Sequence, residues 1–206
     1  MAQMFYIHPD NPQKRLLEQV VNILNNQGVI AFPTDSGYSL GCTLDNKYGV
    51  DRICKIRELN KNHNFTLMCR DLSELSSYAY VDNSRFRLLK NNTPGQYVFI
   101  LEANKEVPRR LMNEKRKTIG LRIPDNKIDQ SLLALLTKPL MTTSLILPND
   151  DFAQSDPEEI DQIIGHQIDA IIHGGYLGQQ PTSIIDLTHD YPEIIRRGSG
   201  DVTPFI

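Results

Sequence analysis

The stretch VIAFPTDSGYSLGC, residues 29–42, decides the fold of this chain. Its first four residues form a short apolar run, which is typical of a buried strand. Pro33 is predicted to end that strand, and a polar loop with Gly37 and Gly41 follows, where the backbone can turn tightly or approach a ligand. In α/β proteins such loops at the carboxyl ends of strands bind ligands. The local pattern equally allows a plain turn that joins two core segments.

Strands and helices alternate on both sides of this stretch. Further strands are predicted at residues 5–7, 65–69, 97–101, 118–123, 140–144, 168–172, 183–187 and 193–197. Helices are predicted from Pro12 to Gly28, at 46–58 and 128–136, and from caps at Asp71 and Asp156. This order, with its strand-rich end, predicts one α/β or mixed α+β domain over residues 1–206, with a twisted, mostly parallel or mixed sheet flanked by helices.

Composition excludes several classes of protein. The chain has 206 residues, of which 40% are hydrophobic and 23% charged, so it can bury a normal core. No apolar run approaches the ~20 residues of a membrane span, and no signal peptide is visible. Cys42, Cys54 and Cys69 form no C-x-x-C pair, which favours reduced, mostly buried thiols and a cytoplasmic location. With a net charge of −3, binding to a polyanion would need local basic clusters.

Several segments resemble one family in the same order along the chain. PTDSGYSLGC resembles the opening motif P-T-D-T-x-Y-G-L-G of the YrdC-like superfamily, the threonylcarbamoyl-AMP synthases and their relatives. Four later segments fit as well: GLRIP (120–124), TTS (142–144), TSIIDL (182–187) and IIRRG (194–198). On these five segments the chain is identified as a member of this superfamily, most similar to its YciO branch. The resemblance implies a single YrdC-like domain with a positively charged concave face.

The resemblance also implies an activity. Such an enzyme condenses L-threonine, bicarbonate and ATP to threonylcarbamoyl-AMP and pyrophosphate, which feeds the modification of tRNA at adenosine 37. ATP would be a substrate that arrives with Mg²⁺, because a metal ion spreads the charge of the triphosphate. No tightly bound cofactor and no metal site of the protein itself are expected.

Three arginines are predicted to surround the substrates: Arg57, Arg122 and Arg196. Each lies where a strand ends or a loop begins, and the guanidinium fork suits phosphate and carboxylate oxygens. Taken singly, each arginine could equally form surface salt bridges. The resemblance implies that Arg122 helps to hold the threonine and Arg196 the nucleotide, with Thr34 and Thr182 lining the amino-acid side.

A family tetrad, Lys-x-Arg and Ser-x-Asn, is only partly present. The segment 56–60 aligned with I-K-x-R-P has Arg57 in place of the lysine and Leu59 in place of the arginine. Ser144 matches the family serine, whereas Ile146 replaces the asparagine. Arg57 and Ser144 are therefore the predicted catalytic and phosphate-binding residues. Loss of one active-site donor costs about a hundredfold in rate, so reduced synthase activity is expected.

Other polar positions of the family pocket have also changed. Met68 stands where many relatives have a histidine, and Val98 where a threonine is usual. The five histidines of the chain lack the spacing of a metal site. His173 follows a predicted strand, so it could face the site, although a histidine of purely structural role is the simpler interpretation.

A basic segment suggests a second class of function. Five basic residues could contact the phosphates of double-stranded RNA or tRNA, or could simply form a solvated surface. The alternative function is thus a double-stranded RNA-binding protein that keeps the fold and a nucleotide pocket but lacks efficient catalysis; Leu59 and Ile146 favour it. The five residues are Arg109, Arg110, Lys115, Arg116 and Lys117.

Overall fold

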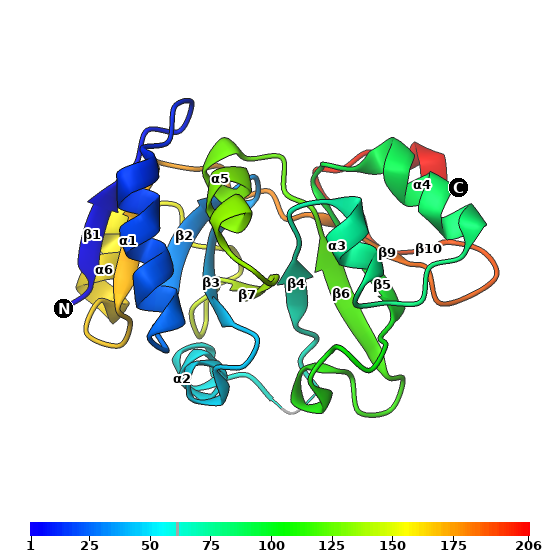
Figure 1. Ribbon diagram of the computed structural model, residues 1–206, viewed down its shortest axis with the longest axis horizontal. Helices are drawn as coiled ribbons and strands as arrows, with labels where there is room; N and C mark the ends of the chain where they lie inside the picture. Colours follow the sequence, from blue (N-terminus) through cyan, green and yellow to red (C-terminus); the bar gives the residue numbers. More distant parts are fainter. Residues whose placement is uncertain (61) are drawn as a thin grey trace.

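The computed structural model describes residues 1–60 and 62–206. Within these residues ten strands form a single mixed sheet in the order β1-β8-β2-β3-β7-β4-β6-β5-β9-β10 (Figure 1). The strands are β1 (Gln3–Tyr6), β2 (Ile30–Thr34), β3 (Gly37–Thr43), β4 (Thr66–Met68), β5 (Tyr97–Glu102), β6 (Thr118–Arg122), β7 (Leu140–Ser144), β8 (Ala170–His173), β9 (Ser183–Asp186) and β10 (Glu193–Arg196).

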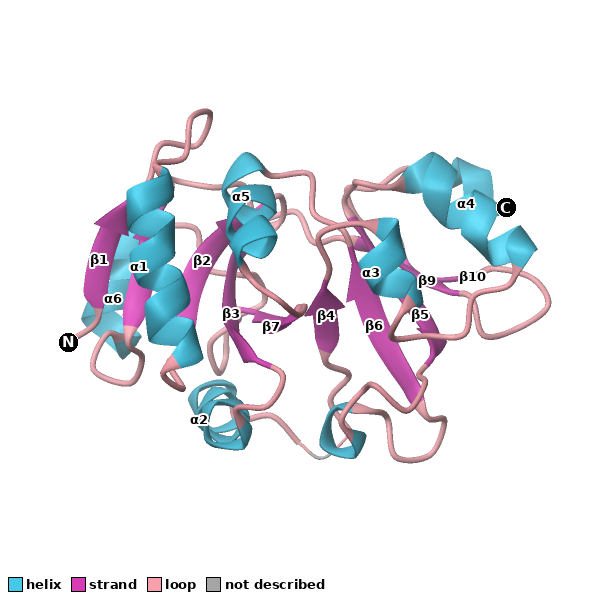
Figure 2. Ribbon diagram, viewed as in Figure 1, coloured by secondary structure: helices cyan, strands magenta, loops and turns pink. Residues whose placement is uncertain are grey.

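Helices cover the two faces of this sheet unequally (Figure 2). The helices are α1 (Lys14–Asn25), α2 (Lys47–Arg57), α3 (Leu72–Ser76), α4 (Asn83–Asn92), α5 (Lys127–Leu135) and α6 (Pro157–Ile164), with short 3-10 turns at Arg109–Leu111 and Thr203–Phe205. Apolar residues of α1 and α5 form one buried cluster with the strands, and those of α2, α3, α4 and α6 form another. The two clusters lie on opposite faces of the twisted sheet, so the predicted mixed α/β architecture is confirmed.

The stretch that decides the fold forms a tight hairpin. Pro33 does not end the first strand, because β2 continues to Thr34 and pairs Pro33 with Tyr38 of β3. The predicted polar loop is therefore wrong, and the alternative of a turn between two core segments is correct. Only Asp35 and Ser36 separate the strands, and Gly37 has a φ of +100°, which favours glycine. The alternation of Tyr38, Ser39 and Leu40 is the strand pattern that supports this hairpin.

The helices match their predicted starts to different degrees. Asp156 accepts a hydrogen bond from the Glu158 N–H at 2.9 Å, with Pro157 at the first helical position, as predicted for α6. Helix α1 begins at Lys14 instead of Pro12. Helix α4 was not predicted, because it is mostly polar and buries only Leu89, so its sequence has little apolar periodicity.

Strand alternation leaves one sheet face for a site. Leu67, Leu121 and Phe99 pack into the core beneath α3 and α4. Successive strand residues point to opposite faces, so their neighbours project from the other side of β4, β6 and β5. These neighbours line a cavity and are not covered by a helix. They are Thr66, Gly120, Val98 and Ile100.

Within the described residues, no helix combines the length and the apolar character that crossing a bilayer requires. Cys42, Cys54 and Cys69 form no disulfide there, and two of them are buried. Burial raises the pKa of Cys42 to about 12, so this thiol stays protonated.

Candidate functional site

A cavity of about 220 Å³ brings together residues from seven strands and from the end of α2. Three arginines line it, and none of the described residues that line it is a carboxylate. Of the predicted site residues it contains Arg57, Arg122, Ser144, Thr182 and Arg196.

Arg57, the last residue of α2, is held by uncharged partners. Its Nε donates to the Ile146 carbonyl at 2.9 Å, and its Nη1 donates to Thr143 Oγ1 at 2.6 Å. Burial lowers the pKa of Arg57, although a guanidinium remains protonated in proteins. The side chain is thus fixed in place with its charge uncompensated.

Arg196, on β10, has a similar environment. Its Nε donates to the Thr182 carbonyl at 2.9 Å and its Nη2 to the Thr182 hydroxyl at 3.0 Å. Burial also lowers the pKa of Arg196. Thr182, predicted on the amino-acid side, therefore lies directly beside the arginine predicted on the nucleotide side. Both Arg57 and Arg196 present to the cavity a cation that no carboxylate among the described residues neutralises.

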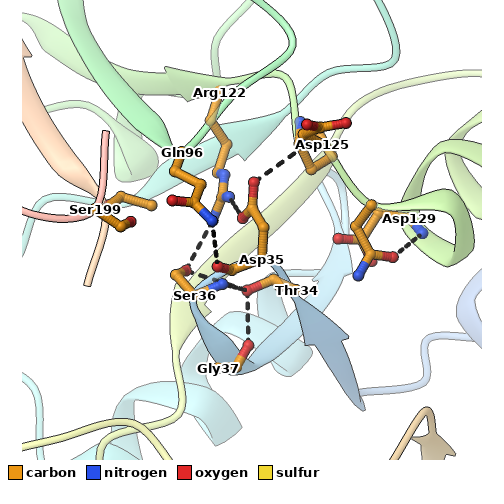
Figure 3. A network of polar contacts seen from close by, with 12 residues as sticks. Thr34, Asp35, Ser36, Gly37, Gln96, Arg122, Asp125, Asp129 and Ser199 are labelled. Atoms are coloured by element: carbon orange, nitrogen blue, oxygen red, sulfur yellow. Dashed lines mark hydrogen bonds and ion pairs between the residues drawn. The ribbon is translucent and has the colours of Figure 1, made fainter. Parts of the chain in front are cut away.

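Arg122 differs, because it forms an ion pair with Asp35 in which both side chains are only 6% exposed (Figure 3). Its Nη1 also donates to Ser36 Oγ at 3.4 Å, and Asp35 Oδ2 accepts from the Asp125 N–H at 3.2 Å. The pair joins β6 to the β2–β3 hairpin. The charge of Arg122 is therefore balanced within the protein.

A second carboxyl group lies close to this pair. Asp129, on α5, is buried, and neither of its carboxyl oxygens has a hydrogen-bond partner among the described residues (Figure 3). Burial raises its pKa well above the usual range. Asp35, which forms the ion pair, is the carboxylate that balances Arg122.

Thr34 is the predicted site residue that the fold keeps out of the cavity. Its hydroxyl donates to the Gly37 carbonyl at 2.6 Å and accepts from the Ser36 N–H at 3.0 Å. Both bonds close the hairpin turn. Thr34 thus stabilises the hairpin turn that contains Asp35, the residue that forms the ion pair with Arg122.

The positions that depart from the family pattern are distributed unequally. Ile146 and Val98 line the cavity, as the resemblance implies. Leu59 instead packs against the hydrophobic core, and its N–H donates to the Cys54 carbonyl at 2.9 Å. Met68 is buried in the cluster beneath α1 and α5. Among the changed positions, Ile146 and Val98 therefore lower the polarity of the cavity lining.

Sequence reasoning missed His63. Its Nε2 lies 3.0 Å from Thr143 Oγ1, and its ring meets Phe65 edge-on. Burial and the neighbouring Arg57 lower the pKa of His63 to about 4. The residue lies in the polar segment 60–64, which has no periodic pattern, so only its place before a predicted strand could have pointed to it. His173, the histidine considered from the sequence, lies elsewhere and stacks on Tyr6.

The basic segment is partly neutralised by the rest of the protein. Arg110 donates to the Leu44 carbonyl, and Arg116 forms an ion pair with Asp186 at 2.7 Å. Two of the five side chains thus already have internal partners. Arg109, Lys115 and Lys117 form no ion pair with the residues that the structure describes.

One group of side chains has the spacing of a cation site. Ligand atoms of Asp186, His189 and Glu193 lie within 4.8 Å of one another. Asp186, however, already accepts hydrogen bonds from Arg116 and from Thr188. A bound guanidinium repels a metal ion, so this arrangement is explained by the ion pair.

Sequence comparison gives three findings. The Sua5–YciO–YrdC family model, described as "Telomere recombination", matches residues 22–198. The chain is 62% identical to the protein YciO of Escherichia coli K12 over 206 residues, which is 100% of both chains. It is 27% identical to a threonylcarbamoyl-AMP synthase of Vibrio vulnificus over 187 residues, which is 88% of this chain and 98% of the synthase.

Solved structures show the same fold. The crystal structure of E. coli YciO, 62% identical, has a TM-score of 0.97 and covers 100% of both chains. The crystal structure of P. abyssi Sua5 complexed with L-threonine, 20% identical, has a TM-score of 0.86 and matches 95% of this chain and 57% of that one. The second likeness concerns the fold alone.

Proposed function

This chain belongs to the Sua5–YciO–YrdC family, as its motifs predicted, and we propose that it is an enzyme of the threonylcarbamoyl-AMP synthase type with reduced activity. It would join L-threonine, bicarbonate and ATP and release pyrophosphate. The observation that carries this proposal is the pair of uncompensated cations, Arg57 and Arg196, that face one cavity. Desolvated cations of this kind favour the phosphates of a nucleotide.

The three arginines suggest how the substrates divide the cavity. The phosphates would be contacted by Arg57 and Arg196. The Ser144 hydroxyl would also contact them, since it forms no hydrogen bond with another described residue. The amino acid would bind between Arg122 and Thr182. The structure of P. abyssi Sua5 complexed with L-threonine supports an amino-acid substrate for this fold.

Magnesium would be held by the substrate. Mg²⁺ prefers oxygen ligands and usually binds through carboxylates together with substrate phosphates. Because none of the described residues that line the cavity is a carboxylate, the ion would arrive on ATP and be bound mainly by its phosphates. The chain itself would supply positive charge and orientation.

Ile146 supports reduced activity. It lines the cavity where an asparagine of the family pattern would donate a hydrogen bond, and an isoleucine side chain has no donor. Binding of the nucleotide depends mainly on charge, so it would be affected less than the rate.

The test is calorimetry with ATP, followed by an assay with labelled bicarbonate and L-threonine. Arg196→Ala should weaken ATP binding by ~1.5–3 kcal/mol, the range for a hydrogen bond to a charged group. Arg87→Ala, which removes an exposed arginine on α4, is the matched control and should bind normally. Equal affinity for both variants, or no adenylate product from the wild type, would refute the proposal.

RNA binding is the second candidate. The observation in its favour is that Arg109, Lys115 and Lys117 have no ion pair with described residues. We propose that binding of duplex RNA weakens as the salt concentration rises. In a variant with all three residues changed to Gln, the slope of log affinity against log salt concentration should be smaller by about one unit per lost contact. If that variant binds duplex RNA as strongly as the wild type does, the RNA-binding proposal is refuted and only the enzyme proposal remains.

A further inference from the structure

The cavity contains a titratable residue to which the proposed function gives no role. We propose that His63 takes up a proton when an anionic group of the ligand binds beside Arg57, so that the occupied cavity holds the ligand with an additional cation. This inference rests on the proposed function in one respect: it requires a phosphate-bearing ligand in this cavity.

Geometry places His63 and Arg57 on one hydroxyl group. Thr143 Oγ1 lies 2.6 Å from Arg57 Nη1 and 3.0 Å from His63 Nε2. A guanidinium can only donate, so the threonine oxygen accepts from Arg57. The hydroxyl proton is then free to donate to Nε2 of a neutral imidazole. All three side chains line the cavity, so a ligand that reaches one of them is near the other two.

Burial, together with the charges around His63, explains why this side chain is neutral in the free protein. Arg57 is the charged group that acts on it, and the other charged residues that line the cavity, Arg122 and Arg196, are cations too. The Phe65 ring edge, the Thr143 hydroxyl and the neighbouring Asn64 are uncharged. Within the described residues no carboxylate lines the cavity to stabilise an imidazolium.

A bound anion changes this balance. A negative charge within ~4–6 Å of a histidine favours its protonated form, and here the anion would also offset Arg57. This compensation raises the pKa of the imidazole from about 4 toward its ordinary value of about 6.5, against the burial that lowers it. At pH 6, the bound protein would then carry a proton on His63 that the free protein lacks. The proton would come from solvent.

Protonation would also reorganise the hydrogen bonds. Nε2–H of the imidazolium can only donate, so it would donate to Thr143 Oγ1, which has two lone pairs for Arg57 and His63. The Thr143 hydroxyl proton would then turn toward the ligand. One proton taken up by His63 would thus provide both a positive charge and a new donor in the cavity.

The experiment counts protons taken up on binding. AMP is titrated calorimetrically into the protein at pH 6.0 in buffers of different ionisation enthalpy, with wild type, His63→Gln and His166→Gln. His166 is an exposed histidine outside the cavity and serves as the control. Wild type and His166→Gln should take up about half a proton or more in excess of His63→Gln, as expected for a pKa that rises from about 4 to about 6.5. Titration of the phosphate itself is common to all three proteins.

Equal proton uptake by wild type and His63→Gln would overturn the inference. If that variant fails to fold, histidine side-chain NMR of the wild type replaces it: the His63 resonances should move to imidazolium positions on addition of AMP, and neutral positions at saturation would overturn the inference. Inorganic pyrophosphate is the second probe. Pyrophosphate binding without AMP binding would refute the nucleotide proposal while still testing His63, and binding of neither would refute both.

Discussion

One cavity contains arginines in opposite electrostatic states. Arg122 is buried in an ion pair with Asp35, and its charge is balanced inside the protein. Arg57 and Arg196 are held instead by carbonyl and hydroxyl oxygens, so their charges remain available. The difference indicates that Arg122 helps to hold the hairpin against β6, whereas Arg57 and Arg196 are poised for an anionic ligand. Residue type alone does not reveal this difference, because it depends on the partner that the fold supplies.

The largest expected effect comes from breaking the ion pair of Arg122. Asp35→Ala should destabilise the protein by about 3–5 kcal/mol, because it leaves Arg122 as an unpaired buried charge. Urea unfolding measures the loss. Asp125→Ala is the control, since that exposed side chain should change stability by no more than ~0.5 kcal/mol. If Asp35→Ala unfolds like the control, the pair has no structural role.

The next effect concerns the chemistry beside Arg57, one of the two cavity arginines without an ion pair among the described residues. Ile146→Asn restores a donor that lines the cavity and should raise threonylcarbamoyl-AMP formation by up to about a hundredfold. Leu59→Arg should bring no gain, because Leu59 packs against the core. Product formation with ATP, bicarbonate and L-threonine is measured for both variants. A gain from Leu59→Arg alone would contradict this assignment.

The smallest effect is a pH dependence. Folded His63 has a pKa of about 4, below the ordinary value of about 6.5, so the unfolded chain binds more protons between these values. Stability should therefore fall as pH falls through this window. Between pH 7 and pH 5 the wild type should lose about 1 kcal/mol more than His63→Gln, after allowance for partial exposure. If the free energy of unfolding changes with pH in the same way for both proteins, the pKa of His63 is not lowered in the folded state.

Much of the fold could be predicted from the sequence, because apolar runs and alternation mark most of the strands. The hairpin was misjudged because a proline usually ends a strand. Here Pro33 lies within β2, next to its last residue, and pairs with Tyr38 of β3. Helix α4 was missed because a polar surface helix carries little periodic signal.

Part of the site could be predicted only through the family resemblance. It added Ser144 and assigned roles to Arg57 and Arg196, which were already candidates from their places at strand and loop ends, and the structure brings the three together. The ion pair of Arg122 and the environment of His63 could not be predicted, because each depends on a partner about eighty residues away in the chain. Local patterns carry no information about such pairs.

The two-residue turn between β2 and β3 constrains how this family member can change. Side chains alternate between faces, so one inserted residue would turn Ser39 away from the cavity and Tyr38 and Leu40 out of the core. Such an insertion would also displace Asp35 from Arg122. Homologues with new specificities should therefore differ here by substitution and not by length. The connection between β8 and β9 shares this restriction, because the Tyr38 hydroxyl donates to the Gly175 carbonyl at 2.8 Å and Thr182 lines the cavity.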